Sequence, residues 1–180
     1  RSAGILEISN GRSPRVGALR GTSLIHLLQH ALATQQATPE QALDLRAAIE
    51  VRAAELAAEK RSDGDTVELS KSVRGMKRAR RNIDAFVEHD VRFHERLCAA
   101  TGNPLFALVS GALSQAMATS VRAGMESRSD QQQVLRDIES HQDIVDAIAA
   151  RDPKAARACM ERHFNEARGA LARGRGRKEP

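Results

Sequence analysis

The stretch IDAFVEHDVRFHERLCAATGNP, residues 83–104, combines an apolar repeat of helical period with a clear helix-end signal. One face of this predicted helix is formed by a stripe of five residues: Ile83, Phe86, Asp90, His94 and Leu97. Their spacing of about three to four residues is typical of an amphipathic α-helix. Gly102 supplies a helix terminus and Pro104 opens the next helix. The stretch therefore predicts two consecutive helices, the first with ionisable side chains on its inward face.

Helical patterns broken by short turns continue on both sides of this stretch. Before it, LDLRAAIEVRAAELAAEK (residues 43–60) follows a cap at Thr38 and Pro39, and a further pattern covers residues 66–80. After it, one helix is expected to reach about Gly124, a second to end before Arg151, and a third to start at Pro153. These patterns predict six helices from residue 39 onward, which indicates an antiparallel helical bundle.

The residues before Pro39 have a different pattern. ILEIS and VGAL are typical of short strands, and residues 10–15 between them are turn formers, which predicts a β-hairpin. Two strands alone are marginal in water, so we interpret the hairpin as the remnant of a further domain or as packed on another element. SLIHLLQHALATQQA, residues 23–37, predicts a short connecting helix. The fold class is thus all-α, a bundle of six to seven helices preceded by a short β-hairpin.

The composition suits a single helical domain. The chain has 180 residues, 41% of them apolar, with four Phe and no Trp or Tyr. The net charge of +5 permits an acidic partner without identifying one. We find no membrane span and no signal peptide, and therefore expect a soluble cytoplasmic protein. Cys98 and Cys159 lie far apart without a CxxC spacing, so we interpret both as small core residues.

Ionisable side chains occupy three predicted inward faces. His141 follows Ile138 on the fifth helix, and His163 follows Met160 on the sixth. A divalent metal would compensate their burial, with four candidate ligands: Asp90, His94, His141 and His163. The alternative is a set of hydrogen-bonded core histidines. Outside this set, we interpret His26, His30 and His89 as solvent-exposed.

The charge of such a site indicates its use. Three neutral imidazoles, one carboxylate and a divalent cation leave a net charge of about +1, which favours an anionic ligand such as a small carboxylate. A tetrahedral zinc would instead be closed by four protein ligands and purely structural. Arg46 is a candidate anion clamp, although the pattern alone favours a surface pair with Glu50 one turn later. A basic run at residues 71–81 is interpreted as a solvated face, with DNA contact as the alternative.

Several motifs in order give the chain a family resemblance. LRAAIE and AAELAAEKR in the first helix, DVRFHERLCAATGNPLF, ESHQDIVDAIAARD and AARACMERHF together span residues 43–171. The chain resembles the FadR branch of the GntR-type bacterial transcription regulators, specifically their C-terminal FCD ligand-binding domain. The four candidate ligands stand where the metal-binding version of that domain has its own.

The resemblance implies four segments. Residues 1–22 are similar to the truncated wing of a winged helix-turn-helix head, with Arg12 and Arg15 as weak phosphate contacts and the recognition helix before Arg1. A connecting segment covers residues 23–38, the FCD-like domain 39–172, and a disordered basic tail 173–180. The family further implies a homodimer that binds operator DNA through its head and a small organic acid through Arg46 and Asn103. The metal is expected to be zinc or nickel, with manganese or iron as alternatives.

A rival interpretation is a metal-dependent hydrolase or oxygenase that uses the same Asp/His site. Such catalysis needs a general base or a second metal beside the first. Glu139 and Asp143 flank His141 but are displaced from the apolar stripe. No Glu-x-x-His pair of a di-iron bundle occurs in two helices. We therefore expect a sensor domain and not an enzyme.

Overall fold

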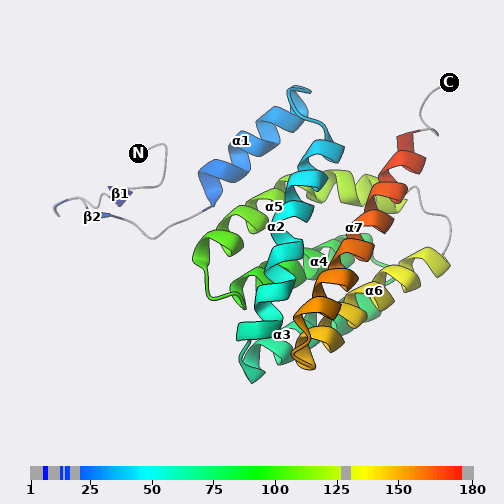
Figure 1. Ribbon diagram of the computed structural model, residues 1–180. Coiled ribbons are helices and arrows are strands. Elements are labelled where there is room, and N and C mark those ends of the chain that lie inside the picture. The colour runs from blue at the N-terminus through cyan, green and yellow to red at the C-terminus, as the bar shows by residue number, and fades with distance from the viewer. Residues whose placement is uncertain (1–5, 8–12, 14, 17–20, 127–130, 176–180) are drawn as a thin grey trace.

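The structure is a computed structural model, and it describes residues 6–7, 13, 15–16, 21–126 and 131–175. Within these residues it contains seven helices, which are α1 (Thr22–Ala33), α2 (Pro39–Lys60), α3 (Asp63–Arg78), α4 (Ile83–Ala99), α5 (Pro104–Glu126), α6 (Gln131–Ala149) and α7 (Pro153–Arg175). Two short strands, β1 (Leu6–Glu7) and β2 (Arg15–Val16), pair antiparallel. The expected all-α bundle is confirmed (Figure 1).

Local sequence signals fix most helix ends. Thr38 and Gln41 form a reciprocal capping box before α2, and Ser62 does the same with Asp65 before α3. Asp152 accepts a hydrogen bond from the backbone of Ala155 at 3.0 Å and so caps α7. After α4 the chain reverses at Gly102, whose φ of +71° lies in the left-handed region that favours glycine.

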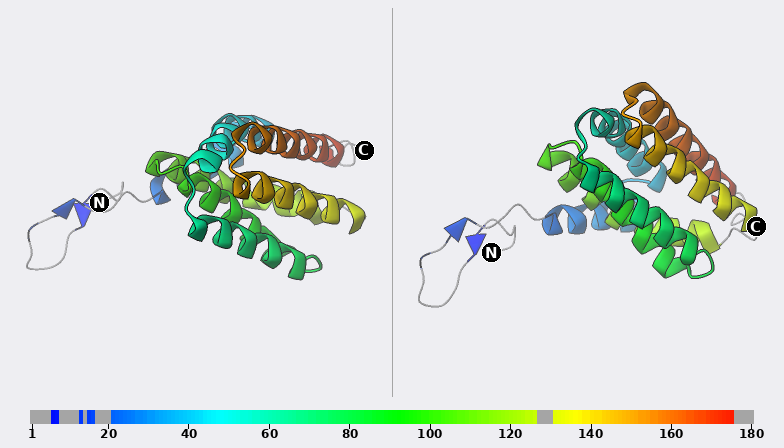
Figure 2. Two further views of the ribbon diagram at one scale, coloured as in Figure 1. Left: turned by 60° about the horizontal axis from the view of Figure 1, so that its bottom comes forward. Right: turned by 90° about the horizontal axis from the view of Figure 1, so that it is seen from below.

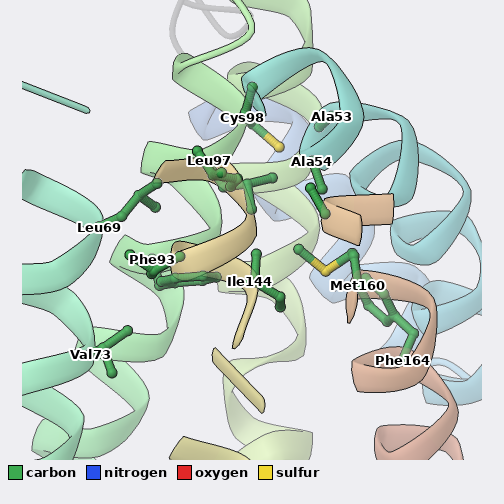
Figure 3. Packing of buried hydrophobic residues seen from close by; sticks show 14 of the residues in the cluster. Ala53, Ala54, Leu69, Val73, Phe93, Leu97, Cys98, Ile144, Met160 and Phe164 are labelled. Atoms are coloured by element: carbon green, nitrogen blue, oxygen red, sulfur yellow. The ribbon is translucent and has the colours of Figure 1, made fainter. Parts of the chain in front are cut away.

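The bundle packs around α2, which contacts α4, α5, α6 and α7. Ala53, Ala54, Ala57 and Ala58 are fully buried on this helix, and such small side chains allow neighbouring helices to approach closely. In Figure 3, Ala54 of α2 lies among Leu97, Ile144 and Met160, which come from three other helices. Both views of Figure 2 show α6 and α7 running side by side. The helices that carry the predicted ligands therefore share one core.

Some details differ from the sequence-based expectation. α3 begins at Asp63, three residues before the predicted start, because its capping box lies at Ser62. α7 continues to Arg175, so residues 173–175 are helical and do not belong to a disordered tail. On α6, Leu135 is 44% exposed and so does not belong to the inward face that carries Ile138 and His141. His89 is half-buried, because its ring packs against the side-chain-free surface of Gly75.

Among the described residues, α5 is the helix whose length and apolar composition come nearest to those of a membrane span. Its part Pro104–Arg122 has a mean hydropathy of 1.3 and is long enough to cross a membrane by length and composition alone. The same helix packs against α1, α2 and α4, and it contributes Leu113 and Met117 to the hydrophobic core. The core helix of a helical bundle has the same composition, and α5 packs as such a helix.

Candidate metal and anion site

Three predicted histidines meet in the interior of the bundle. His94 on α4, His141 on α6 and His163 on α7 each offer one nitrogen, and these atoms lie within 4.8 Å of one another. His94 and His141 are fully buried and His163 is 6% exposed. Each helix brings its imidazole inward because the residue stands on an apolar stripe that packs into the common core.

The Nδ1 atom of each imidazole faces a protein group. Nδ1 of His141 lies 2.7 Å from the backbone oxygen of Asp137, and Nδ1 of His163 lies 3.4 Å from the Ser140 hydroxyl. Nδ1 of His94 contacts the Glu50 carboxylate. A carbonyl oxygen and an ionised carboxylate only accept hydrogen bonds, so His94 and His141 must donate from Nδ1. In their neutral form, both then present a lone pair at Nε2.

These Nε2 atoms converge on Asp90. Its Oδ1 lies 3.7 Å from Nε2 of His94 and 3.2 Å from Nε2 of His141. Both nitrogens are buried and neither has an aligned hydrogen-bond partner. Two nitrogen lone pairs and a carboxylate oxygen repel one another unless a cation or a proton lies between them. The donor set of one carboxylate and three imidazoles therefore fits a divalent metal.

Burial and mutual contacts shift the pKa values of three candidate ligands. Burial lowers the pKa of His141, but the close approach and negative charge of the Asp90 carboxylate outweigh burial and raise it overall. Burial also raises the pKa of Asp90, and its contacts with His141 and His94 bring it well below its usual range. For His163, burial and the neighbouring charges of His141 and His94 all lower the pKa far below its ordinary value. His163 is therefore neutral, as a metal ligand must be.

Glu50 is a site residue that the sequence interpretation missed. The predicted pair with Arg46 exists, with Arg46 Nε 2.7 Å from Glu50 Oε1, but both side chains are buried and not on the surface. The Ser110 hydroxyl donates to Oε1 at 2.7 Å as well. Burial raises the pKa of Glu50, but Arg46, His94 and Ser110 together lower it to about 2. The available signal was the position of Arg46 and Glu50 on the alanine-rich face of α2.

A small cavity opens beside these groups. It has a volume of about 70 Å³, and its polar lining includes Arg46, Asp90, His94 and His163. Nη2 of Arg46 is buried and has no hydrogen-bond partner. An unpaired buried guanidinium nitrogen costs free energy, which an anion in the cavity would recover.

The remaining predicted residues lie elsewhere. Asn103 is exposed, and its side chain accepts a hydrogen bond from the backbone of Leu105 at the start of α5. Asn103 is not among the residues that line the cavity with Arg46. Arg12 lies outside the described residues, and Arg15 belongs to β2. The basic residues at 71–81 are exposed, as expected of a solvated face.

The two carboxylates that were considered as catalytic bases lie outside the site. Glu139 and Asp143 are both exposed, and Asp143 pairs with Arg162 at 3.0 Å. Neither carboxylate lines the cavity beside the histidines. The cluster therefore brings together nitrogen and oxygen atoms that fit a cation and a guanidinium nitrogen that fits an anion, and Glu139 and Asp143 lie outside it.

Related proteins agree with this architecture. The Glc operon transcriptional activator of Escherichia coli K12 is 30% identical over 169 residues, covering 91% of this chain and 66% of the activator. The transcriptional repressor NanR of Cronobacter sakazakii is 28% identical, covering 90% of this chain and 63% of the repressor. The chain thus spans slightly less than two thirds of these two relatives.

Solved structures show the same fold at low sequence identity. A GntR protein of Streptococcus agalactiae superposes with a TM-score of 0.66 at 22% identity, covering 93% of this chain and 75% of that one. The E. coli protein McbR/YncC gives a TM-score of 0.66 at 16% identity, covering 96% and 79%. The FCD domain family itself matches residues 40–166. The chain belongs to the FCD domain family, as the C-terminal domain of a GntR/FadR-type transcription regulator, and is not an enzyme.

Proposed function

We propose that this chain is the effector-sensing domain of its regulator, binding a divalent metal through Asp90, His94, His141 and His163. One observation carries the proposal. Buried Nε2 atoms of two histidines face a carboxylate without an aligned hydrogen bond, while their Nδ1 atoms are held by acceptors. This arrangement is typical of imidazoles prepared for metal binding. Zinc or nickel suits the imidazole-rich set best, with manganese and iron as alternatives.

The effector is a small carboxylate. The bound metal would supply a site of net positive charge, because Asp90 neutralises only one of its two charges and the Arg46–Glu50 pair is neutral as a whole. The free Nη2 of Arg46 adds a directed donor for an anionic oxygen. The cavity of about 70 Å³ is much smaller than the roughly 300–1,000 Å³ of pockets for drug-sized ligands. Only an acid of a few heavy atoms fits.

The regulator acts as a homodimer on operator DNA, with its head domain making the base contacts. Two adjacent helices support a second copy as the partner of this chain. α1 and the segment 104–121 of α5 contain no Asp, Glu, Lys or Arg, although 28% of the chain is charged. They pack on each other and leave Leu27 and Leu105 exposed. Charge depletion of this kind is typical of interface centres. Such a regulator works in the cytoplasm, where its operator is.

The experiment combines metal analysis with anion binding. Elemental analysis of purified protein should give one metal ion per chain, and calorimetry with acetate or glycolate should show binding only to the metal-loaded form. Arg46→Gln should keep the metal and lose most of the anion affinity. Metal-free wild type that still binds the acid, or carefully prepared protein that takes up no metal, would contradict the proposal.

A closed structural zinc site is the second candidate. It is favoured by the burial of all four ligands, which leaves little space around them. Chelation separates the two cases. A structural site loses its fold when stripped, whereas a sensor remains helical and loses only its affinity for the acid.

A further inference from the structure

Glu50 contacts both parts of the proposed site, the metal ligands and the anion clamp. Its Oε2 contacts Nδ1 of His94, a candidate metal ligand. Its Oε1 accepts hydrogen bonds from Nε of Arg46, the candidate anion clamp, and from the Ser110 hydroxyl, each at 2.7 Å. These groups come from α2, α4 and α5, and the carboxylate is fully buried. It is the group that joins the two parts.

We propose that Glu50 is a positioning residue that couples metal binding to anion binding, an inference that rests on the metal and anion sites proposed above. Its carboxylate fixes the His94 ring with the proton on Nδ1, which leaves the Nε2 lone pair for the metal. The same carboxylate holds Nε of Arg46 and thereby leaves Nη2 free for the anion. A change in either contact is transmitted to the other through a single side chain.

The Nδ1 contacts of the other two imidazoles that the structure describes stay within α6 and α7. His141 is held by a backbone oxygen of its own helix, and His163 by a neighbouring serine hydroxyl at 3.4 Å. Neither of these contacts is with Arg46. Beside the direct attraction between the metal charge and the anion, a side-chain linkage between the metal and the anion clamp therefore runs through His94 and Glu50, and by thermodynamic necessity the coupling acts equally in both directions.

Glu50→Gln tests this role because the amide has one acceptor and one donor end. Two donors, Arg46 and Ser110, face one oxygen, so the amide oxygen stays there and the NH2 group faces His94. His94 must then move its proton from Nδ1 to Nε2, where it blocks the metal. We expect zinc affinity to fall about 10–100-fold, the range found for partners that orient metal ligands.

The anion measurement separates positioning from charge. At saturating zinc, acetate affinity should fall about tenfold in Glu50→Gln, because Arg46 loses its anchor. If Glu50 acted only through its charge, removing a negative group near the site would strengthen acetate binding. Glu50→Asp keeps the charge, but it is shorter by about 1.5 Å and cannot reach both partners. It should therefore resemble Glu50→Gln, and wild-type affinities in Glu50→Asp would overturn the proposal.

Ser114→Ala is the matched control, because Ser114 is a buried serine one turn along α5 from Ser110 and its hydroxyl has no hydrogen-bond partner among the described residues. Zinc and acetate affinities of this variant should stay within about threefold of wild type. Circular dichroism and thermal unfolding of the metal-free proteins check that each variant folds. If wild type binds no zinc at all, the proposed function fails. If wild type binds zinc and both Glu50 variants bind it equally well, only the coupling role fails.

A measurement on metal-free wild type keeps the inference testable should the variants not fold. The 15N chemical shifts of the His94 ring report which nitrogen carries the proton. Glu50 requires the proton on Nδ1 before any metal is added. A neutral His94 with its proton on Nε2 would overturn the proposal, whatever the metal content of the protein.

Discussion

Replacement of His163 by alanine tests the metal site through stability. A ligand that binds only the folded state stabilises it by RT ln(1 + [L]/Kd), which is about 2.7 kcal/mol at a free zinc concentration of 100 Kd. For a chain of 180 residues, each kcal/mol raises the melting temperature by about 2–4 °C. Wild type should therefore melt about 5–11 °C higher with zinc than without it.

His163→Ala removes one of three clustered imidazoles. If zinc affinity falls about 100-fold, the same concentration equals Kd and the stabilisation drops to about 0.4 kcal/mol, or about 1–2 °C. Each protein is compared with its own metal-free melting temperature, so the cavity left by the substitution cancels. The measurement is a pair of calorimetric or fluorescence melting scans at matched free zinc, set with a metal buffer.

His26→Ala is the control, because His26 is an exposed histidine on α1 that lies outside the cluster. It should retain the whole zinc-dependent shift. The reasoning would be refuted by a full shift in His163→Ala, or by loss of the shift in both variants, which would indicate zinc binding at surface histidines.

Three further predictions concern stability. Leu97→Ala in the fully buried core should lower the free energy of unfolding by about 2–5 kcal/mol in urea titrations, whereas Leu45→Ala at a 51% exposed position should change it by less than about 0.5 kcal/mol. Arg151 has a φ of +55°, so Arg151→Gly should be about 1–2 kcal/mol more stable than Arg151→Ala in the same titration, and equal stabilities would contradict this. The pKa of Glu50 is lowered from 4.5 to about 2 in the folded protein, because Arg46, His94 and Ser110 outweigh burial. Its stabilisation, about 3 kcal/mol, is therefore complete above pH 4.5 and is lost as the pH falls toward 2, so acid titration should bring wild type and Glu50→Gln closer in stability in that window.

Arg46 shows why the role of a side chain could not be assigned before the packing of the helices was known. From the pattern, a pair with Glu50 on the surface and an anion clamp were alternatives. In the structure the pair is buried and an Nη2 donor has no hydrogen-bond partner, so the pair with Glu50 and the proposed anion contact are compatible in one residue. Asn103 shows the opposite case. Its place before Pro104 predicted both a cap and a ligand contact, and the structure supports only the cap.

The sequence by itself determined the class of fold, most of the helix ends and the inward position of three histidines. Helical periodicity and capping residues are local signals, since each acts within about four residues of the chain. The inward stripes place His94, His141 and His163 on core faces whichever helix packs against which. For this reason their burial could be predicted before the arrangement of the helices was known.

Only the tertiary structure decided what lies between the helices. The contact of Glu50 with His94 joins residues 44 positions apart, and that with Ser110 spans 60 positions. The periodicity of one helix does not specify which neighbour it meets or at what rotation, because these depend on how the helices of the bundle fill a common core. The partner of each imidazole, the free Arg46 donor and the small cavity therefore follow from packing and not from any local pattern.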